Sequence, residues 1–412
     1  MAEAARSGPL AGLRVVELAH IMAGPVCGLM LADMGAEVIK VEKVPGGDDT
    51  RRFRPPEIGG ESAAFMMANR NKRGIAVDLK QEAGRRVVRR LLAGADVAIE
   101  NYRRGTMERM GLSYESLKAE NPGLILCEIS GFGRSGPYAD RGGFDLIAQG
   151  MSGLMSITGE APGRPPVKVG APVTDITAGI LGALGICAAY AHRLRTGEGQ
   201  RVDTSLFEAG ITQTFWQSAI ALATGESPGP LGSAHPLNAP YQAFATADGW
   251  ITVGAANQAN WLRLLEVIEA PALGEDPSFV SNEQRVRNVE ALAEALAPIF
   301  AARPSADWLA RLEAAGVPAG PVSGIAEMHR DPQALARGMV VEVPHARLGP
   351  IATLGPPVKF SETPAAVLHG APLLGQDSRA VLSELGYAQD EIETLIDQAV
   401  VIAADEPATA GG

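Results

Sequence analysis

The chain has 412 residues, of which 46% are hydrophobic and 20% are charged. This length is enough for one large hydrophobic core and a smaller second one, so we expect two domains in an ordinary globular enzyme rather than a disordered or fibrous chain. With 36 Lys and Arg against 47 Asp and Glu, the net charge is -11, which repels nucleic acid and anionic membranes and excludes both as partners of the whole molecule.

The first 135 residues alternate between strand-like and helix-like segments. Strand-like runs of β-branched and aliphatic residues lie at 14–18, 37–42, 73–79, 96–100 and 124–132. Helical patterns lie between them at 23–36, 82–95 and 107–123. Such alternation predicts an α/β domain with a parallel sheet covered by helices, an architecture that often binds nucleotides.

After residue 135, the amino-acid composition and pattern of the chain change. Residues 144–210 add two helical patterns and a strand-like segment, and residues 220–240 are dense in Gly, Pro and Ser, which indicates a linker or a functional loop. We therefore predict a large domain at 1–220, a smaller α+β domain at 221–330, and a C-terminal segment at 331–412 that returns to the large domain.

Three features bear on the location of the protein. Cys27, Cys127 and Cys187 form no CxxC motif and lie in apolar surroundings, as small core residues of a reducing cytoplasm do. The first ten residues, MAEAARSGPL, lack the basic and apolar regions of a signal peptide. The apolar run 176–191 is shorter than the roughly 18 to 20 residues of a bilayer span and is interrupted by glycines, so we expect a buried core helix and a cytoplasmic protein.

The string GFGRSG at 131–136 matches the glycine pattern of a dinucleotide-binding turn, and it follows a predicted strand. The residues after it, PYADRGG, read as a loop, whereas a dinucleotide fingerprint opens a helix at its last glycine. A dehydrogenase is thus a weak alternative, and we favour a tight loop whose glycines allow a close backbone approach.

Several other enzyme classes lack their signatures. We expect no metal site, because no HxH or HxxxH spacing occurs among the six histidines, His20, His192, His235, His329, His345 and His369. The GxSxG elbow of serine hydrolases and the Walker A loop are also absent from the sequence.

Basic side chains gather near the ends of the predicted strands. They are Lys43, Lys72, Arg73, Lys80, Arg103, Arg104 and Arg109. The carboxyl ends of parallel strands share one edge of a sheet, where ligands bind. Any one of these charges is more often a solvated surface group, but as a set that follows successive strands they favour a site for a phosphorylated nucleotide.

Asp175 stands where a loop rich in Pro and Gly enters the long apolar segment. An Asp in this place often caps a helix by accepting a backbone N–H bond, which is worth about 1 kcal/mol. Alternatively, the helix dipole holds it ionised as a nucleophile, and the free amides stabilise an oxyanion when it attacks a carbonyl. The residues alone leave both interpretations open.

Over nearly its whole length the chain resembles the class III CoA-transferases of the CaiB/BaiF type, which include formyl-CoA:oxalate and carnitine CoA-transferases. The motifs are specific as an ensemble and weak individually: GPLAGLRVVELAHIMAGPVCGLMLADMGAEVIKVEKVPGGDDTR, NKRGIAVDLK, ENYRRGTMERMGL, ISGFGRSGPYADRGGFDLIAQGMSGLMSITG, GAPVTDITAG, GQRVDTSLFEA, APYQAFATADGW, AAGVPAGPV and PLLGQDS.

The resemblance implies a Rossmann-like large domain, a smaller domain and an interlocked homodimer of two ring-like subunits. It implies that Asp175 is the catalytic nucleophile and that coenzyme A is part of the acyl-CoA substrate rather than a permanently bound cofactor. By position, the implied CoA contacts are His20, Ile21, Met22, Ala23, Lys43, Val77, Lys80, Asn101, Tyr102, Arg109, Arg141 and Phe144.

The implied chemistry suits a carboxylate. Asp175 attacks the donor thioester to give a mixed anhydride and CoA thiolate, and the thiolate then forms an aspartyl-CoA thioester and releases the first acid. An incoming acid reverses these steps. One thioester is exchanged for another, so neither ATP nor a metal is required.

Two departures from the formyl-CoA:oxalate enzymes bear on the substrate. Those enzymes carry glutamine at the position of Met22 and a glycine-rich loop where this chain has LGSAHPLNAP, residues 231–240. Oxalate is therefore disfavoured. The loop is more similar to those of succinyl-CoA-dependent relatives that act on small dicarboxylates such as glutarate, hydroxymethylglutarate, malate, citramalate or mesaconate. This resemblance implies a succinyl-CoA donor and a small dicarboxylic acceptor, and we predict that His235 lies near the acceptor.

Two alternatives stay open, the first inside the same superfamily and the second from another functional class. An α-methylacyl-CoA racemase needs two bases on opposite faces of the reacting carbon and supplies a His just before an Asp. The matching pair here is Phe144 and Asp145, and a phenyl ring accepts no proton, which disfavours racemisation. A thioesterase or a CoA-binding protein without activity is the other alternative.

Overall fold

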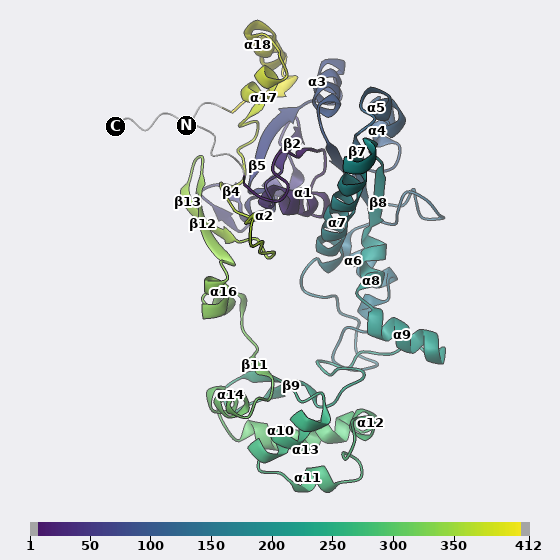
Figure 1. Cartoon of the computed structure of the whole chain (residues 1–412), viewed down its shortest axis with the longest axis vertical. Coiled ribbons are helices and arrows are strands. Elements are labelled where there is room, and N and C mark those ends of the chain that lie inside the picture. Colours follow the sequence, from purple (N-terminus) through teal and green to yellow (C-terminus); the bar gives the residue numbers. More distant parts are fainter. Residues whose placement is uncertain (1–6, 405–412) are drawn as a thin grey trace. The chain divides into compact units, whose positions relative to one another are not determined.

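The computed structural model describes residues 7–404, which divide into two units (Figure 1). Within the described residues, the first unit comprises 7–152, 170–213 and 332–404, and the second comprises 153–169 and 214–331. The second unit therefore begins a few residues before the predicted boundary at 221. It also includes the segment 153–169, which the sequence pattern did not separate from the large domain.

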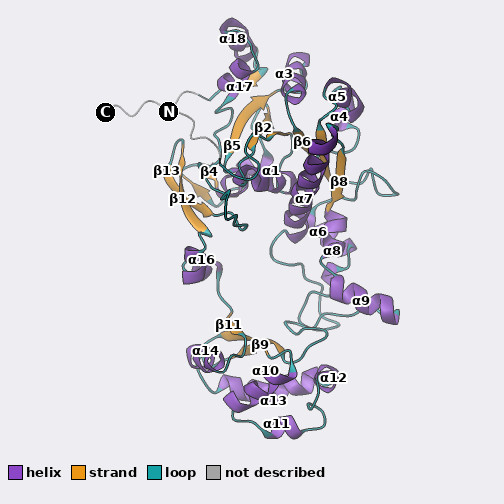
Figure 2. Cartoon of the chain, viewed as in Figure 1, coloured by secondary structure: helices purple, strands orange, loops and turns teal. Residues whose placement is uncertain are grey.

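The first unit is built on a seven-stranded sheet (Figure 2). Its strands, in spatial order, are β14 (Val401–Ile402), β5 (Lys72–Val77), β2 (Glu37–Lys43), β1 (Arg14–Glu17), β6 (Val97–Glu100), β7 (Ile125–Ser130) and β8 (Arg201–Ser205). All neighbouring pairs are parallel except β14 with β5. The predicted α/β class with a parallel sheet is thus confirmed, and the strand order reverses direction between β1 and β6.

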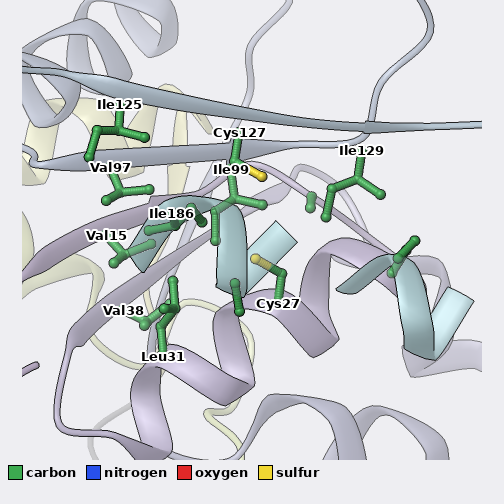
Figure 3. Close-up of a cluster of buried hydrophobic side chains, with 14 of the residues drawn as sticks. Val15, Cys27, Leu31, Val38, Val97, Ile99, Ile125, Cys127, Ile129 and Ile186 are labelled. Atoms are coloured by element: carbon green, nitrogen blue, oxygen red, sulfur yellow. The ribbon is translucent and has the colours of Figure 1, made fainter. Parts of the chain in front are cut away.

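Helices cover both faces of this sheet because its strands are apolar on both sides. On one face, Val15, Val97 and Ile125 pack with α1 (Ala23–Asp33) and α7 (Val173–Thr196) (Figure 3). On the other, Val16 and Ala98 pack with α3 (Glu82–Ala93), α5 (Tyr114–Glu120), α17 (Ser378–Glu384) and α18 (Gln389–Asp397). Successive residues of a strand therefore enter opposite cores, as the two-residue period requires.

Helix α7 is the predicted core helix, although it runs for 24 residues and passes through its glycines without a break. Of the helices described, it alone is long and apolar enough by length and composition to cross a membrane. One of its faces lies in the core against α1, where a Cβ added at Gly179 would lie 2.6 Å from the Ala23 carbonyl oxygen. The opposite face exposes Ile180, Leu184 and Leu194.

The second unit is α+β. Its antiparallel sheet has the order β11 (Ala319–Pro321), β10 (Trp250–Gly254) and β9 (Tyr241–Ala245). Its longer helices are α9 (Phe215–Thr224), α10 (Gln258–Val267), α13 (Val289–Ala301) and α14 (Ser305–Ala314), and the short helix α12 (Asn282–Arg287) precedes α13. A compact core forms around Trp261, Phe300 and Trp308.

The C-terminal segment completes the first unit. It contributes a hairpin of β12 (Val340–His345) and β13 (Gly349–Leu354), the helices α17 and α18, and the edge strand β14 beside β5.

Candidate active site

The switch point of the large sheet brings the loop after β1 together with the residue that follows β6. The Asn101 side chain donates from Nδ2 to the His20 carbonyl oxygen at 2.7 Å, and its Oδ1 accepts the His20 backbone N–H at 3.0 Å. In open parallel sheets, ligands bind at the carboxyl ends of the strands at this point. Residues 20–23 and Asn101, all predicted CoA contacts, therefore lie together at this edge.

A buried ion network fixes the same loop from its other side. Ile21 has a φ of +68°, which is unusual for a β-branched residue, and its N–H donates to both Asp48 carboxylate oxygens at 3.1 Å. Asp48 pairs with the fully buried Lys40 at 2.9 Å, and Lys40 also pairs with Glu17 at 2.9 Å. Burial by itself would lower the pKa of Lys40, but Glu17 and Asp48 outweigh it and raise that pKa. The loop thus rests on charges that stay ionised.

A pocket of about 80 Å³ opens beside this loop, lined by residues that include His20, Lys43 and Tyr102. The rings of His20 and Tyr102 lie 5.8 Å apart, and burial lowers the pKa of His20 and raises that of Tyr102 to about 12. Lys43 is exposed and pairs with Asp49 at 2.7 Å. Three of the predicted CoA contacts therefore line one cavity.

The predicted set of basic side chains is only partly correct. β5 begins at Lys72, so Lys72 and Arg73 lie at the amino end of the strand, opposite the ligand edge. Lys72 is buried and pairs with Glu17 at 2.8 Å, and burial lowers its pKa to about 8. Arg73 pairs with Glu37 at 2.6 Å and with Glu384 at 2.7 Å. Both residues stabilise the fold.

The other basic residues do follow strand ends. Lys80 is exposed in the turn after β5, and Arg103, Arg104 and Arg109 are exposed after β6. Val77, at the end of β5, is fully buried between β2 and β14, so the structure does not expose this predicted contact to a ligand.

A larger pocket of about 300 Å³ lies beside the carboxyl end of β6, with residues of β7 and β8 and with Arg103 and Arg104 in its lining. Three other lining residues form ion pairs: Arg134 pairs with Glu100 and, at 3.2 Å, with Glu128. Burial raises the pKa of Glu100 to about 7 despite the nearby guanidinium. No sequence pattern indicates this network, because its three members come from separate segments of the chain.

Arg134 lies in the GFGRSG loop, which is not a dinucleotide-binding turn. A Cβ added at Gly131 would lie 2.7 Å from the Gly143 backbone nitrogen, so the predicted close backbone approach is between two segments of the chain itself. Of the remaining predicted contacts, Arg141 stacks 4.6 Å from the centre of the Tyr138 ring, and Phe144 is 69% exposed.

Asp175 is the third residue of α7 and is not its N-cap. The capping position is Pro172, whose side chain forms no hydrogen bond. Thr174 instead donates from its backbone N–H and its hydroxyl to Asp145 Oδ1, at 3.0 and 2.8 Å. Gln149 donates to the other oxygen of Asp145 at 2.8 Å. Asp145, the first residue of α6 (Asp145–Met151), thus supplies the cap expected of Asp175.

The Asp175 carboxylate is half-buried and has no hydrogen bond or ion pair to any residue within 7–404. Burial and, second, the negative charge of Asp145 raise its pKa to about 7. The expectation that the helix end holds it fully ionised is therefore wrong, because desolvation and a like charge dominate. Such a carboxylate is more basic than an ordinary Asp and is a stronger nucleophile when ionised.

His235 belongs to the second unit and packs against two aromatic rings, Tyr241 at 5.3 Å and Trp216 at 6.3 Å. The Leu237 backbone N–H donates to His235 Nδ1 at 3.1 Å. A backbone N–H is a donor only, so Nδ1 must be the acceptor and the neutral ring carries its proton on Nε2. Nε2 is therefore a ready hydrogen-bond donor for a carboxylate.

Potential metal ligands do not gather: residues 7–404 contain no group of three or more His, Cys, Asp and Glu side chains that could hold a metal ion.

Comparison with known proteins finds relatives along nearly the whole chain. The family model of CoA-transferase family III matches residues 10–378. A succinate–glutarate CoA-transferase from Agrobacterium fabrum is 43% identical, over 92% of this chain and 96% of that protein. A succinyl-CoA:glutarate CoA-transferase from Mus musculus is 38% identical, over 95% and 90%. The crystal structure of a CAIB/BAIF family protein from Brucella suis has 42% identity and a TM-score of 0.82, covering 92% of this chain and all of that one.

Proposed function

Because this chain belongs to CoA-transferase family III and is therefore a CoA-transferase, we propose that it moves CoA from succinyl-CoA to a small dicarboxylic acid through the Asp175 carboxylate. The state of that carboxylate carries the proposal. It lies in the first turn of α7 without a partner in the described chain, while Asp145 takes the capping hydrogen bonds. An unpaired, basic carboxylate is free to attack an acyl carbon.

In the first step, an Asp175 oxygen attacks the thioester carbonyl of the donor, the C–S bond breaks, and CoA leaves as a thiolate. The product is a mixed anhydride between Asp175 and the donor acid. The thiolate then attacks the aspartyl carbonyl, the donor acid leaves as a carboxylate, and an aspartyl-CoA thioester forms. The acceptor carboxylate runs the same steps in reverse and regenerates Asp175, so no ATP, metal or permanently bound cofactor takes part.

We place the CoA moiety along the carboxyl edge of the first unit's sheet. The pocket beside His20 and Tyr102 supports this position, as do the exposed cations after β5 and β6. The phosphate groups of CoA need such a local group of cations, because the protein as a whole carries a net charge of -11 and would otherwise repel them. The proposed contacts are those named from the resemblance, apart from Val77, which is fully buried.

A dicarboxylic acceptor is supported by two observations. The relatives described above are named for succinate, succinyl-CoA and glutarate. In this chain, His235 presents an Nε2 donor that suits the second carboxylate of such an acid. Met22 and the 231–240 loop differ from the oxalate-specific pattern, so oxalate serves as the contrasting acid in the test.

We also propose an interlocked homodimer. None of the residues of α9, all of which are described, is buried, and Phe215, Trp216 and Leu222 are 73%, 58% and 89% exposed. Ile180 and Leu184 add apolar surface on α7. Apolar helix surface of this kind is typical of an interface, and a second copy of the chain is the occupant we propose. Light scattering of the purified protein should give a mass near twice 42.9 kDa.

The decisive experiment incubates the enzyme with succinyl-CoA and each acid of a panel: glutarate, hydroxymethylglutarate, malate, citramalate, mesaconate and oxalate. Mass spectrometry should detect a new thioester with a dicarboxylate longer than oxalate and none with Asp175→Ala. Hydroxylamine added during turnover should modify the peptide that contains Asp175. Free CoA without a new thioester would indicate hydrolysis. Solvent deuterium on the α carbon of a 2-methylacyl-CoA would indicate racemisation.

A further inference from the structure

The loop that carries His235 is held by two side chains of the short helix α12. Asn282 donates from Nδ2 to the Leu237 carbonyl oxygen at 2.9 Å, and its Oδ1 accepts the Ala239 backbone N–H at 3.1 Å. One amide group therefore fixes the loop on both sides of Asn238. Leu237, whose carbonyl oxygen accepts the bond from Asn282, also donates its backbone N–H to His235 Nδ1. Asn282 therefore fixes the residue whose N–H sets the histidine tautomer.

Arg285, one turn further along α12, holds the same loop from inside the unit. It is fully buried, and its Nε donates to the Ala239 carbonyl oxygen at 2.7 Å. One terminal nitrogen donates to Gln258 Oε1 at 3.0 Å and to the Phe279 carbonyl oxygen at 2.9 Å. The guanidinium thus ties the loop to α10 and to the segment before α12.

A purely structural role does not account for Arg285, because burying its charge is unfavourable for the stability of the fold. It forms no ion pair with any described carboxylate, its other terminal nitrogen is buried without a hydrogen-bond partner, and its nearest ring is Trp261 at 5.0 Å. A buried charge without a counter-ion destabilises a fold relative to a well-packed apolar side chain. Stability alone therefore does not explain a guanidinium at this position, whereas the fixed fork that Arg offers to several carbonyl oxygens does.

We propose that Asn282 and Arg285 are positioning residues that hold the 235–240 loop in the conformation that binds the acceptor acid. This inference rests on the proposed function, in which His235 contacts that acid. If the loop loses its supports, Nε2 of His235 no longer points in one direction, and the acceptor loses a preorganised contact. In the proposed function, the CoA moiety is recognised by residues of the first unit, so the KM for succinyl-CoA should depend much less on these two supports.

The test compares Asn282→Ala and Arg285→Met with Arg287→Ala in the full-length enzyme. Arg287 lies on the same helix, is exposed, and pairs only with Glu283 among the described residues, so it is the matched control. Loss of the loop supports should raise the KM for the acceptor acid about tenfold while the KM for succinyl-CoA changes less than about threefold. Arg287→Ala should leave both constants unchanged. Asn282→Asp, which keeps the bond from Ala239 and loses the one to Leu237, should give an intermediate KM for the acid.

Arg285→Met can fail to fold, so Asn282, which is half-exposed, provides the second variant. A folded Asn282→Ala enzyme with an unchanged KM for the acid would overturn the inference, while the wild-type transfer reaction would still support the proposed function. Equal increases in both KM values would also overturn it, since they indicate a general loss of structure. If Asn282→Ala raises the acid KM and His235→Ala does not, the loop binds the acid as inferred, and only the role of His235 in the proposed function fails.

Discussion

Thr174 donates its backbone N–H and its hydroxyl to Asp145, and in doing so it leaves the next residue in the helix, Asp175, without a capping role. The two carboxylates differ in their environment. Asp145 receives hydrogen bonds from Thr174 and Gln149, whereas Asp175 receives none from the described residues. Asp145 thereby has a structural role, and its negative charge is, after burial, the second cause of the raised pKa of Asp175.

The rate of transfer should rise with pH through the pKa of Asp175. Only the ionised carboxylate attacks the thioester, and burial together with Asp145 raises its pKa to about 7. We expect kcat for acylation to be low at pH 5.5 and to level off above pH 8, with a midpoint near 7. A single-turnover pH profile with succinyl-CoA measures this midpoint, and a profile that is flat down to pH 5 would contradict the raised pKa.

Asp145→Asn should move this midpoint to lower pH. The substitution removes the negative charge beside Asp175 but keeps an oxygen that can accept the two Thr174 bonds. The matched control is Thr174→Val, which removes one of those bonds and leaves the charge in place, so its midpoint should stay near that of the wild type. Equal midpoints in all three enzymes would show that Asp145 does not affect the pKa of Asp175.

Asp175→Asn should stabilise the protein above neutral pH. The folded pKa of Asp175, about 7, lies above its ordinary value of 3.8, so the folded state holds a proton that the unfolded state releases. The stability of the wild type therefore falls as pH rises from about 4 through 7, and the neutral amide avoids this loss. We expect a gain on the order of 1 kcal/mol at pH 8 and little at pH 4, because the site is partly solvated. Urea denaturation at both pH values tests the difference.

The α/β architecture could be predicted because its signals are local. In α3, for example, Val87, Val88, Leu91 and Leu92 form a buried stripe, and the arginines between them face outward. Strand ends were predicted less accurately. Lys72 is the first residue of β5, at the amino end of the strand, so its side chain pairs with Glu17 in the interior and does not reach the ligand edge at the carboxyl ends.

The site itself was predictable in its residue types and not in its electrostatics. Asp175 was identifiable from its place before an apolar helix, but that helix is capped by Asp145, which lies 29 residues before its partner Thr174, and no local pattern links the two. The supports of the His235 loop likewise come from α12, more than 40 residues later. Tertiary contacts of this kind decide pKa values and loop positions, and they leave no periodicity in the sequence.

Asn101→Leu should weaken binding of acyl-CoA. Leucine matches asparagine in size but offers neither of the two hydrogen bonds that hold the His20 backbone. We expect the KM for succinyl-CoA to rise about tenfold and kcat to stay within about twofold, since Asp175 is untouched. Asn101→Asp keeps the acceptor for the His20 N–H and should show a smaller rise. A change in kcat alone would indicate that the loop acts on the chemical step instead.

Lys40→Met should lower the free energy of unfolding by about 3 kcal/mol at pH 7, because it leaves two buried carboxylates, Glu17 and Asp48, without this shared cation. The gap between variant and wild type should stay constant from pH 7 to about 4 and narrow as the pH falls further. In the wild type, Lys40 keeps the pKa of Asp48 well below its ordinary value, so Asp48 contributes stability above that ordinary value and the contribution is lost on acidification.

The control for Lys40→Met is Arg52→Met, which also replaces a cationic side chain by methionine but does so at an exposed ion pair. Arg52 is 62% exposed and pairs with Asp49, so Arg52→Met should change the free energy of unfolding by less than about 0.5 kcal/mol. Both variants lose one positive charge. A comparable decrease in the free energy of unfolding of the two variants would therefore show that the change in net charge is the cause. A large loss confined to Lys40→Met assigns it to the buried network. Asp48 of that network also accepts the N–H of Ile21, one of the proposed CoA contacts. Lys40→Met should therefore also raise the KM for succinyl-CoA.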